Sequence, residues 1–172
     1  MSCSTTSTII KEQKIENYKI IEKVNYGKKG LFYKTLSYEE LPFNYSFSYD
    51  KLNQNNVRYN SITERNRFVN FDTVFNIAQQ RKIDSSFKNL SPVKLKKSLF
   101  TDPKIISKKR SEYGTPRTEL VGYSSISYPF IVNSKNGEKY GFIYRDDGLM
   151  YIYKKENKFW EEFARLEIHF VN

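Results

Sequence analysis

The sequence predicts a single α+β domain built on a mainly antiparallel β-sheet, with a short helical segment in the middle of the chain. Three observations support this expectation. Apolar and polar residues alternate near both ends of the chain, which is the period of a half-buried strand. In the middle, apolar residues fall three or four positions apart, which is the period of a helix. Near the C-terminus, Asn-Gly and Asp-Gly dipeptides separate the strand-like stretches, and these dipeptides favour tight hairpins.

The length and the aromatic content agree with one domain that has a sizeable core. The chain has 172 residues, which is within the usual size of a single domain. Aromatic residues make up 16% of the chain, and each large ring buries much apolar area. We therefore expect residues 15–172 to form one domain, preceded by a flexible and mostly polar lead at residues 1–14.

The first expected element is a β-hairpin. Apolar residues recur at even spacing between residues 18 and 24, which is typical of a strand. Residues 25–30 contain two glycines, and because glycine adopts positive φ freely, this segment is expected to form the turn. Residues 31–38 would then form the return strand.

The middle of the chain is expected to contain two strands followed by two short helices. Residues 43–49 alternate aromatic side chains with Asn and Ser, which predicts a strand, followed by a polar loop at 50–56 and another strand at 57–62. Phenylalanine and alanine at residues 68–78 fall on one helical stripe. The Ser-Pro dipeptide at the start of residues 91–100 is typical of a helix N-cap followed by proline in the first turn, so we expect a second short helix there.

From residue 119 the apolar spacing returns to two, which predicts a meander of antiparallel strands. Asn136-Gly137 and Asp147-Gly148 are the expected hairpin turns. The last stretch fits a helical stripe as well, but its alternation with Arg, Glu and His favours a strand. The expected strands are residues 128–132, 140–144, 149–153 and 164–170, with a short helix or turn at residues 158–162.

Positive charge is concentrated in one segment. The chain has 29 Lys and Arg against 19 Asp and Glu, a net charge of +10. Residues 81–117 hold eleven of these basic side chains and three of the acidic ones, so a charge of +8 lies in this basic segment. Such a charge attracts polyanions, and it is equally typical of a solvated face that keeps a protein soluble.

Our leading functional hypothesis is a small non-catalytic binding or accessory protein that contacts an anionic partner, nucleic acid first of all, through the basic segment. Lys and Arg neutralise phosphates, and the released counterions favour binding. A nearby tyrosine can stack on an unpaired base. No recognised nucleic-acid-binding motif is present, so we expect contacts to phosphates rather than to bases. The candidate residues are Lys94, Lys96, Lys97, Lys104, Lys108, Lys109, Arg110 and Tyr113.

The N-terminus supports a second hypothesis. Cys3 is followed by a Ser/Thr-rich stretch, as in mature bacterial lipoproteins, and a cysteine in this position is also a candidate for palmitoylation. If a signal segment had been removed before it, Cys3 would tether an envelope protein that binds a protein or glycan partner. The alternative is a polar N-terminus with an incidental cysteine. Exposed edge strands would also allow the chain to pair with a protein partner in a larger complex.

A third hypothesis is a metal-dependent nuclease. Asp147, followed by Glu156 and Lys158, has the order of two cation-binding carboxylates and a lysine that assists the attacking water. The same residues also fit polar turns between strands. The chain has one cysteine and one histidine, His169, too few for a cysteine-based or multi-histidine zinc site. Whether the protein is an enzyme stays open at this point; our leading expectation is a protein without catalytic activity, cofactor or bound metal, and the nuclease is the alternative.

The apolar pattern argues against a membrane-spanning protein. No apolar run approaches the ~20 residues that cross a bilayer, and no secretory apolar segment is present. We therefore expect a soluble, intracellular protein, with a tether through Cys3 as the alternative.

Overall fold

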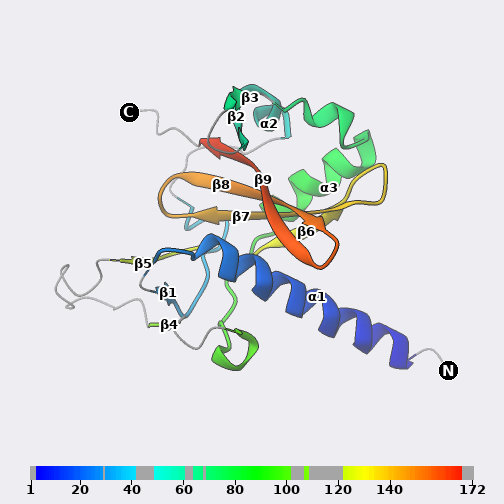
Figure 1. Cartoon of the computed structure of the whole chain (residues 1–172). Helices are drawn as coiled ribbons and strands as arrows, with labels where there is room; N and C mark the ends of the chain where they lie inside the picture. The colour runs from blue at the N-terminus through cyan, green and yellow to red at the C-terminus, as the bar shows by residue number, and fades with distance from the viewer. Residues whose placement is uncertain are drawn as a thin grey trace.

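The protein forms a layered α+β fold in which a mainly antiparallel sheet lies between helices (Figure 1). The computed structural model describes residues 3–28, 30–41, 49–60, 64–67, 69–101, 107–108 and 122–167. A long N-terminal helix covers one face of the sheet, and two shorter helices cover the other. The predicted fold class is confirmed. The helices are α1 (Cys3–Val24), α2 (Tyr49–Asn55) and α3 (Ile77–Lys88), with 3-10 turns η1 (Phe71–Thr73) and η2 (Lys97–Leu99).

The large sheet has six strands within the described residues, and each is antiparallel to its neighbours. Its strand order is β3-β2-β9-β8-β7-β6, so the last four strands of the chain form a continuous meander. The strand predicted at residues 57–62 corresponds to β2. The bounds are β2 (Asn56–Asn60), β3 (Glu64–Arg67), β6 (Phe130–Asn133), β7 (Lys139–Arg145), β8 (Leu149–Glu156) and β9 (Phe159–Glu167).

The turns of the meander follow the local turn chemistry. Gly137 and Gly148 adopt φ values of 81° and 82°, which an L side chain rarely takes, so both predicted hairpin turns are confirmed. The third turn uses Asn157 at φ 54°, a conformation that asparagine tolerates better than most residues. Of the helix or turn predicted at residues 158–162, the turn is present at Lys158, whereas residues 159–162 belong to β9.

A second, small sheet shows that the predicted N-terminal hairpin is wrong. β1 (Gly30–Phe32) pairs in parallel with β4 (Ser107–Lys108) and β5 (Tyr123–Ser124), in the order β4-β1-β5. The return strand predicted at residues 31–38 thus exists in part, but its partners lie far along the chain. A bridge between Ile126 and Arg145 connects the end of this sheet to β7.

Helix α1 occupies the region for which the sequence predicted a flexible lead and a strand. Its buried residues are Asn17, Tyr18, Ile20, Ile21, Val24 and, just after its end, Asn25, which together form a helical stripe. The strand predicted at residues 18–24 is wrong because the even spacing of three apolar residues is also part of that stripe. Among the described residues, no helix has the length and apolar content needed to cross a bilayer.

Both faces of β7 and of the first half of β8 are buried, which explains the dense aromatic content of these strands. Alternate residues of β7 enter different cores: Tyr140, Phe142 and Tyr144 pack on the side of α2 and α3, and Ile143 packs on the side of α1. Trp160 of β9 also lies in the core under α1 and is 1% exposed. The meander is therefore the central layer of the molecule.

Gly141 allows α1 to lie close against this central layer. A Cβ atom at this position would overlap the Cδ1 atom of Ile20, and it would lie 3.4 Å from Cζ3 of Trp160. Since its φ lies outside the positive range that favours glycine, the requirement for glycine here is one of space rather than backbone conformation. The absent side chain leaves the space that the end of the Ile20 side chain occupies between helix and sheet.

The middle of the chain contains helices, as predicted, but they begin and end at other residues than expected. The stripe predicted at residues 68–78 includes η1, whereas α3 begins at Ile77, where the side chain of Asn76 accepts a hydrogen bond from the backbone N–H of Gln79. The Gln79 side chain reciprocates on the Asn76 backbone, which completes a capping box. The following elements differ further: the predicted loop at residues 50–56 contains α2, and the predicted helix at 91–100 is reduced to η2. Of the strand predicted at 43–49, all but Tyr49, the first residue of α2, lies outside the described residues.

Candidate functional site

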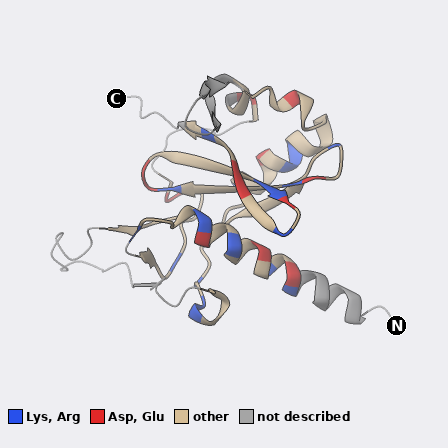
Figure 2. Cartoon of the chain, viewed as in Figure 1, with Lys and Arg blue, Asp and Glu red and all other residues tan. Residues whose placement is uncertain are grey.

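Residues 94–97 of the basic segment form an exposed rim beside the small sheet, whereas residues 81–88 belong to α3. Leu95 is buried and donates its backbone N–H to the carbonyl oxygen of Tyr33 at 2.7 Å, which holds this stretch in an extended conformation. Because side chains alternate along an extended chain, Lys94 and Lys96 point away from the core. The exposed Lys97 follows in η2, the turn below α1 that is partly blue for basic residues in Figure 2.

The fold adds a fourth lysine that the sequence did not single out. Lys34 and Lys94 are partners in an antiparallel β-bridge, and both side chains are exposed. Like charges placed directly opposite each other on neighbouring strands are destabilising. None of the four lysines makes an ion pair with a carboxylate of the described residues. We call this set, Lys34, Lys94, Lys96 and Lys97, the basic surface.

The remaining predicted binding residues lie mostly outside the described residues. Lys108 is in β4, where its backbone pairs with Phe32, two residues before Lys34. The small sheet therefore brings the backbone of Lys108 next to the strand that leads into the basic surface. Lys104, Lys109, Arg110 and Tyr113 lie outside the described ranges.

The structure does not bring the proposed nuclease residues together. Asp147 precedes β8 and Glu156 ends it, so the two carboxylates are separated by a whole strand, roughly 25 Å at ~3.3 Å per residue. Lys158 lies beyond Glu156, in the β8–β9 turn. Among the described residues, no group of three potential metal ligands is present. His169 lies outside those residues, and of Cys3 only the helical backbone is described, so its lipid tether stays a prediction.

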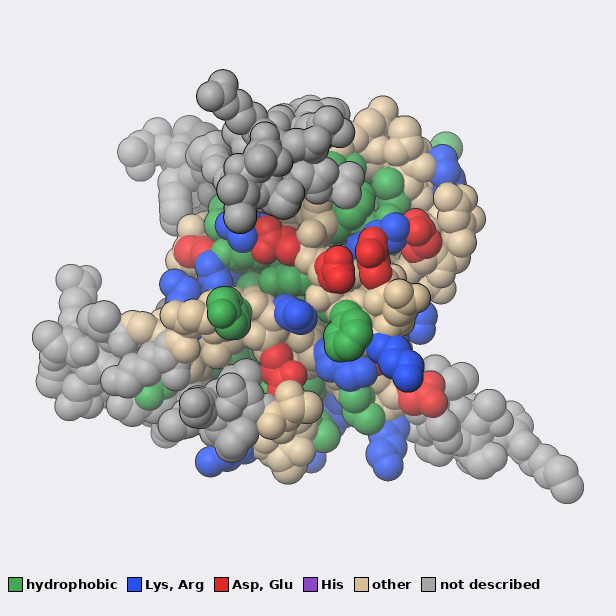
Figure 3. Space-filling view, viewed as in Figure 1, with side chains coloured by type: hydrophobic (Ala, Val, Ile, Leu, Met, Phe, Trp, Pro, Cys, Tyr) green, Lys and Arg blue, Asp and Glu red, His purple; other side chains and the backbone are tan. Residues whose placement is uncertain are grey.

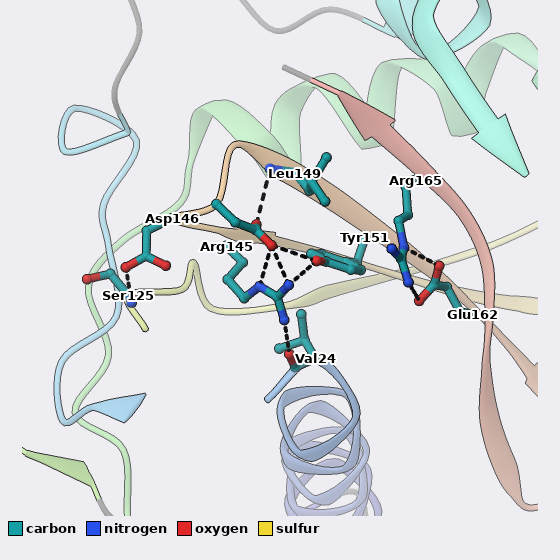
Figure 4. A network of polar contacts seen from close by, with 9 residues as sticks. Val24, Ser125, Arg145, Asp146, Leu149, Tyr151, Glu162 and Arg165 are labelled. Atoms are coloured by element: carbon teal, nitrogen blue, oxygen red, sulfur yellow. Dashed lines mark hydrogen bonds and ion pairs between the residues drawn. The ribbon is translucent and has the colours of Figure 1, made fainter. Parts of the chain in front are cut away.

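A polar network connects the end of α1 to the β7–β8 hairpin (Figure 4). The Arg145 guanidinium donates to the carbonyl oxygen of Val24 at 2.6 Å and, through Nε, to Asp147 at 2.7 Å. Tyr151 donates its hydroxyl to the same carboxylate at 2.7 Å, and the guanidinium stands 4.6 Å from the centre of its ring. Arg165 also stands over that ring, at 5.2 Å. Arg145 therefore places a positive charge at the C-terminus of a helix, where it is favourable.

The protonation equilibria of this network agree with a structural role. Burial raises the pKa of Asp147, but hydrogen bonds from Arg145 and Tyr151 outweigh it and hold the pKa below its usual value. Burial raises the pKa of Asp146 despite a hydrogen bond from the backbone of Ser125. Burial, with the nearby Asp147 carboxylate, also raises the pKa of Tyr151. The charged groups at the centre of the network are bonded to each other, which favours holding α1 in place over binding a ligand.

We expect the buried Tyr144 to make the fold sensitive to alkali. Burial raises the pKa of Tyr144 to about 12 from its ordinary value of 10.0. The unfolded chain releases this proton first, so stability is complete below pH 10 and falls as the pH rises from about 10 to 12. Urea unfolding at pH 9 and pH 11 should show this loss. A smaller loss is expected for Tyr144→Phe, and an equal loss in the variant would contradict the assignment.

A groove of about 860 Å³ lies between α1, Thr101 and the β8–β9 hairpin. Two exposed rings line it: Tyr26, in the turn after α1, is 90% exposed, and Phe159, at the start of β9, is 67% exposed. Figure 3 shows hydrophobic side chains at the end of α1 and at the tip of the β8–β9 hairpin, with basic side chains near them. We call this site the aromatic groove. Its basic lining residues are Lys19, Lys23 and Lys158.

The aromatic groove could not be predicted from the sequence, because Tyr26 and Phe159 line the same groove only after α1 has packed on the sheet. A partial signal existed, since Tyr26 lies in a predicted turn, where a large ring is poorly buried.

Comparison with protein-family models, with curated proteins and with solved structures finds no match to this chain.

Proposed function

We propose that this protein binds nucleic acid through the basic surface, as a non-catalytic binding or accessory protein. The observation that supports this most directly is the β-bridge that places Lys34 opposite Lys94. The fold holds two like charges together without a described carboxylate between them, an arrangement that an external anion would stabilise. Phosphate groups are the anions that lysine neutralises in nucleic acids.

The extended layout of the charges favours a linear polyanion. The lysines follow two paired backbone segments and the η2 turn, and the basic segment continues beyond them along the chain. A nucleic-acid strand carries phosphates at regular intervals, so it can contact several of these lysines in succession. The lysine ammonium groups give no directional pattern that reads base edges, so we expect little dependence on base sequence.

Charge reversal tests the proposal. We expect a variant carrying Lys94→Glu, Lys96→Glu and Lys97→Glu to lose most of its affinity for labelled oligonucleotides, measured by fluorescence anisotropy over a salt series. For the milder triple glutamine variant, the slope of log affinity against log salt should fall by about 0.7–0.9 for each phosphate that a lysine no longer neutralises. Both variants change only exposed side chains, so the fold is expected to persist.

A matched control variant shows whether the affinity depends on the basic surface or only on the net charge of the protein. Lys82, Lys88 and Lys135 are exposed on α3 and on the β6–β7 turn. Reversing these three lysines to glutamate changes the net charge by the same amount and should leave most of the affinity intact. Equal losses in the two triple variants would show that the basic surface is not the contact surface.

A further inference from the structure

We infer that the aromatic groove receives unpaired bases of a single-stranded nucleic acid whose phosphates lie on the basic surface and on the groove lysines. This inference rests on the proposed function and names the form of nucleic acid that the protein prefers. Aromatic rings beside a cationic path are the usual means by which proteins bind single strands without sequence preference. Paired and stacked bases of a duplex cannot present their faces to such rings.

The two rings of the groove are available for stacking. Most large hydrophobic side chains of the described residues are buried, whereas Tyr26 and Phe159 are 90% and 67% exposed and line the same groove. Exposed apolar groups that gather at one place mark interaction sites more often than scattered ones do. Each ring stands beside a hydrogen-bonded or strand-paired backbone: Tyr26 donates its N–H to the Lys23 carbonyl oxygen at 3.2 Å, and Phe159 pairs with Glu156.

Two lysines at the groove are available for contacts with phosphates beside the two rings. Lys23 and Lys158 make no ion pair with the described carboxylates. Two of the acidic lining residues are engaged elsewhere. Glu22 accepts a hydrogen bond from the Thr101 hydroxyl at 2.8 Å, and Glu162 pairs with Arg165 at 2.9 Å.

The third acidic residue lies opposite a lysine. Glu161 is the cross-strand partner of Lys154 on β8. The Lys154 ammonium is bound by Glu138 at 2.7 Å and lies 3.7 Å from Glu156, so it does not cancel the negative charge that Glu161 adds to the groove. The groove is therefore lined by charges of both signs, and the net positive charge of the proposed path comes from the adjoining basic surface.

The groove is continuous with the basic surface through one short segment. The backbone N–H of Lys96 donates to the Tyr18 hydroxyl at 2.7 Å, and Thr101 bonds to Glu22, so residues 96–101 are held along α1. The basic surface lies at one end of this segment, and a wall of the groove lies at the other. A single strand that contacts Lys96 and Lys97 can therefore continue past Thr101 with its bases directed into the groove.

Removal of each ring tests the inference. We expect Tyr26→Ala and Phe159→Ala each to raise the Kd for labelled oligothymidylate roughly 5- to 150-fold and to leave the Kd for a blunt duplex unchanged. Both side chains are exposed, so the variants should fold as the parent does. Tyr26→Phe and Phe159→Tyr keep a ring at each position and should bind as tightly as the parent. The slope of affinity against salt should also stay unchanged, because no cation is removed.

Photocrosslinking locates the bases directly. An oligonucleotide that carries 5-iodouracil should form adducts on Tyr26 or Phe159, detected by mass spectrometry of the digested protein. The single tryptophan, Trp160, lines the groove, so its emission should change on addition of oligothymidylate and not on addition of the duplex.

The outcomes separate the two proposals. If the alanine variants bind oligothymidylate like the parent, or if adducts form only outside the groove, the groove inference is wrong and the basic surface can still stand. Equal weakening of single-strand and duplex binding by the alanine variants would also overturn base stacking in the groove. If the parent protein binds neither nucleic acid at low salt, the proposed function fails, and the inference that rests on it fails too.

Discussion

Replacing Gly141 with alanine should lower the free energy of unfolding by about 1–3 kcal/mol. The new Cβ atom would overlap Cδ1 of the fully buried Ile20 and would press against the Trp160 ring. Since a closely packed core relaxes only partly, either the end of the Ile20 side chain must turn to a less favourable conformation or α1 must shift away from the sheet. Urea unfolding, followed by circular dichroism and by emission of Trp160, measures the loss.

The clashing atom can be removed in a second variant. Ile20→Val deletes Cδ1 and should cost about 0.5–1.5 kcal/mol on its own. In that background Gly141→Ala should cost much less, so the double-mutant cycle should give a coupling of about 1 kcal/mol or more. Gly137→Ala is the control: it has open space around it but a φ of 81°, so its cost comes from backbone conformation. Additive effects of the Ile20 and Gly141 changes would contradict the close approach of α1.

Replacing Arg145 with methionine should lower the free energy of unfolding by about 2–4 kcal/mol. The change leaves the Asp147 carboxylate without its counter-charge and the Val24 carbonyl oxygen without its donor. Methionine retains much of the side-chain length, so the loss reports the charge and the hydrogen bonds more than the packing. Urea unfolding of Arg145→Met, Asp147→Asn and the double variant measures it. The double variant should be more stable than the sum of the single losses predicts.

The Asp147 carboxylate also makes the free energy of unfolding depend on pH in the acid range. Because the pKa of Asp147 is lowered on folding, its contribution is present above about pH 4 and is lost as the pH falls through the lowered value. Asp147→Asn should therefore lose stability less steeply below pH 4 than the parent, while keeping a residue that suits the turn. If the free energy of unfolding falls equally with pH in the parent and in Asp147→Asn, the ion pair between Arg145 and Asp147 contributes little.

The C-terminal half of the fold was predictable because its signals are local. The turn residues at Gly137 and Gly148 and the two-residue period between them lie within a few positions of each other, so the meander is visible without knowledge of distant contacts. Only the start of β9 was misplaced, because a strand and a helix stripe overlap in that stretch. Asn157 supplies the turn that decides between them.

The N-terminal half was not predictable in the same way, since distant partners decide its structure. The stripe around Tyr18 is compatible with a strand until one knows that it packs on β7 and β9. β1 is a strand only because β4 and β5 lie on either side of it. A local capping box at Asn76 could have placed the start of α3, but the phenylalanine spacing before it masked this signal.

The candidate sites also differ in whether local sequence signals or distant contacts bring their residues together. Charge counting found Lys94, Lys96 and Lys97, because a cluster within one segment is visible in the sequence. Lys34 joins them through a β-bridge across 60 positions, which no charge count reveals. The rings of the aromatic groove are further apart still and share a site only after α1 has docked.

The position of α1 also constrains how the chain can assemble during its synthesis. The apolar stripe of α1 is complete at Val24, but the strands that cover it begin with β7 at Lys139. At a translation rate of about 5–20 residues per second, the intervening chain takes on the order of ten seconds to appear. Throughout that time the meander on which the stripe packs is missing, although other partners of the stripe, Leu31 and Leu95, have already been made. Docking of α1 on the meander is therefore among the latest steps of folding, and part of the apolar stripe stays exposed until then.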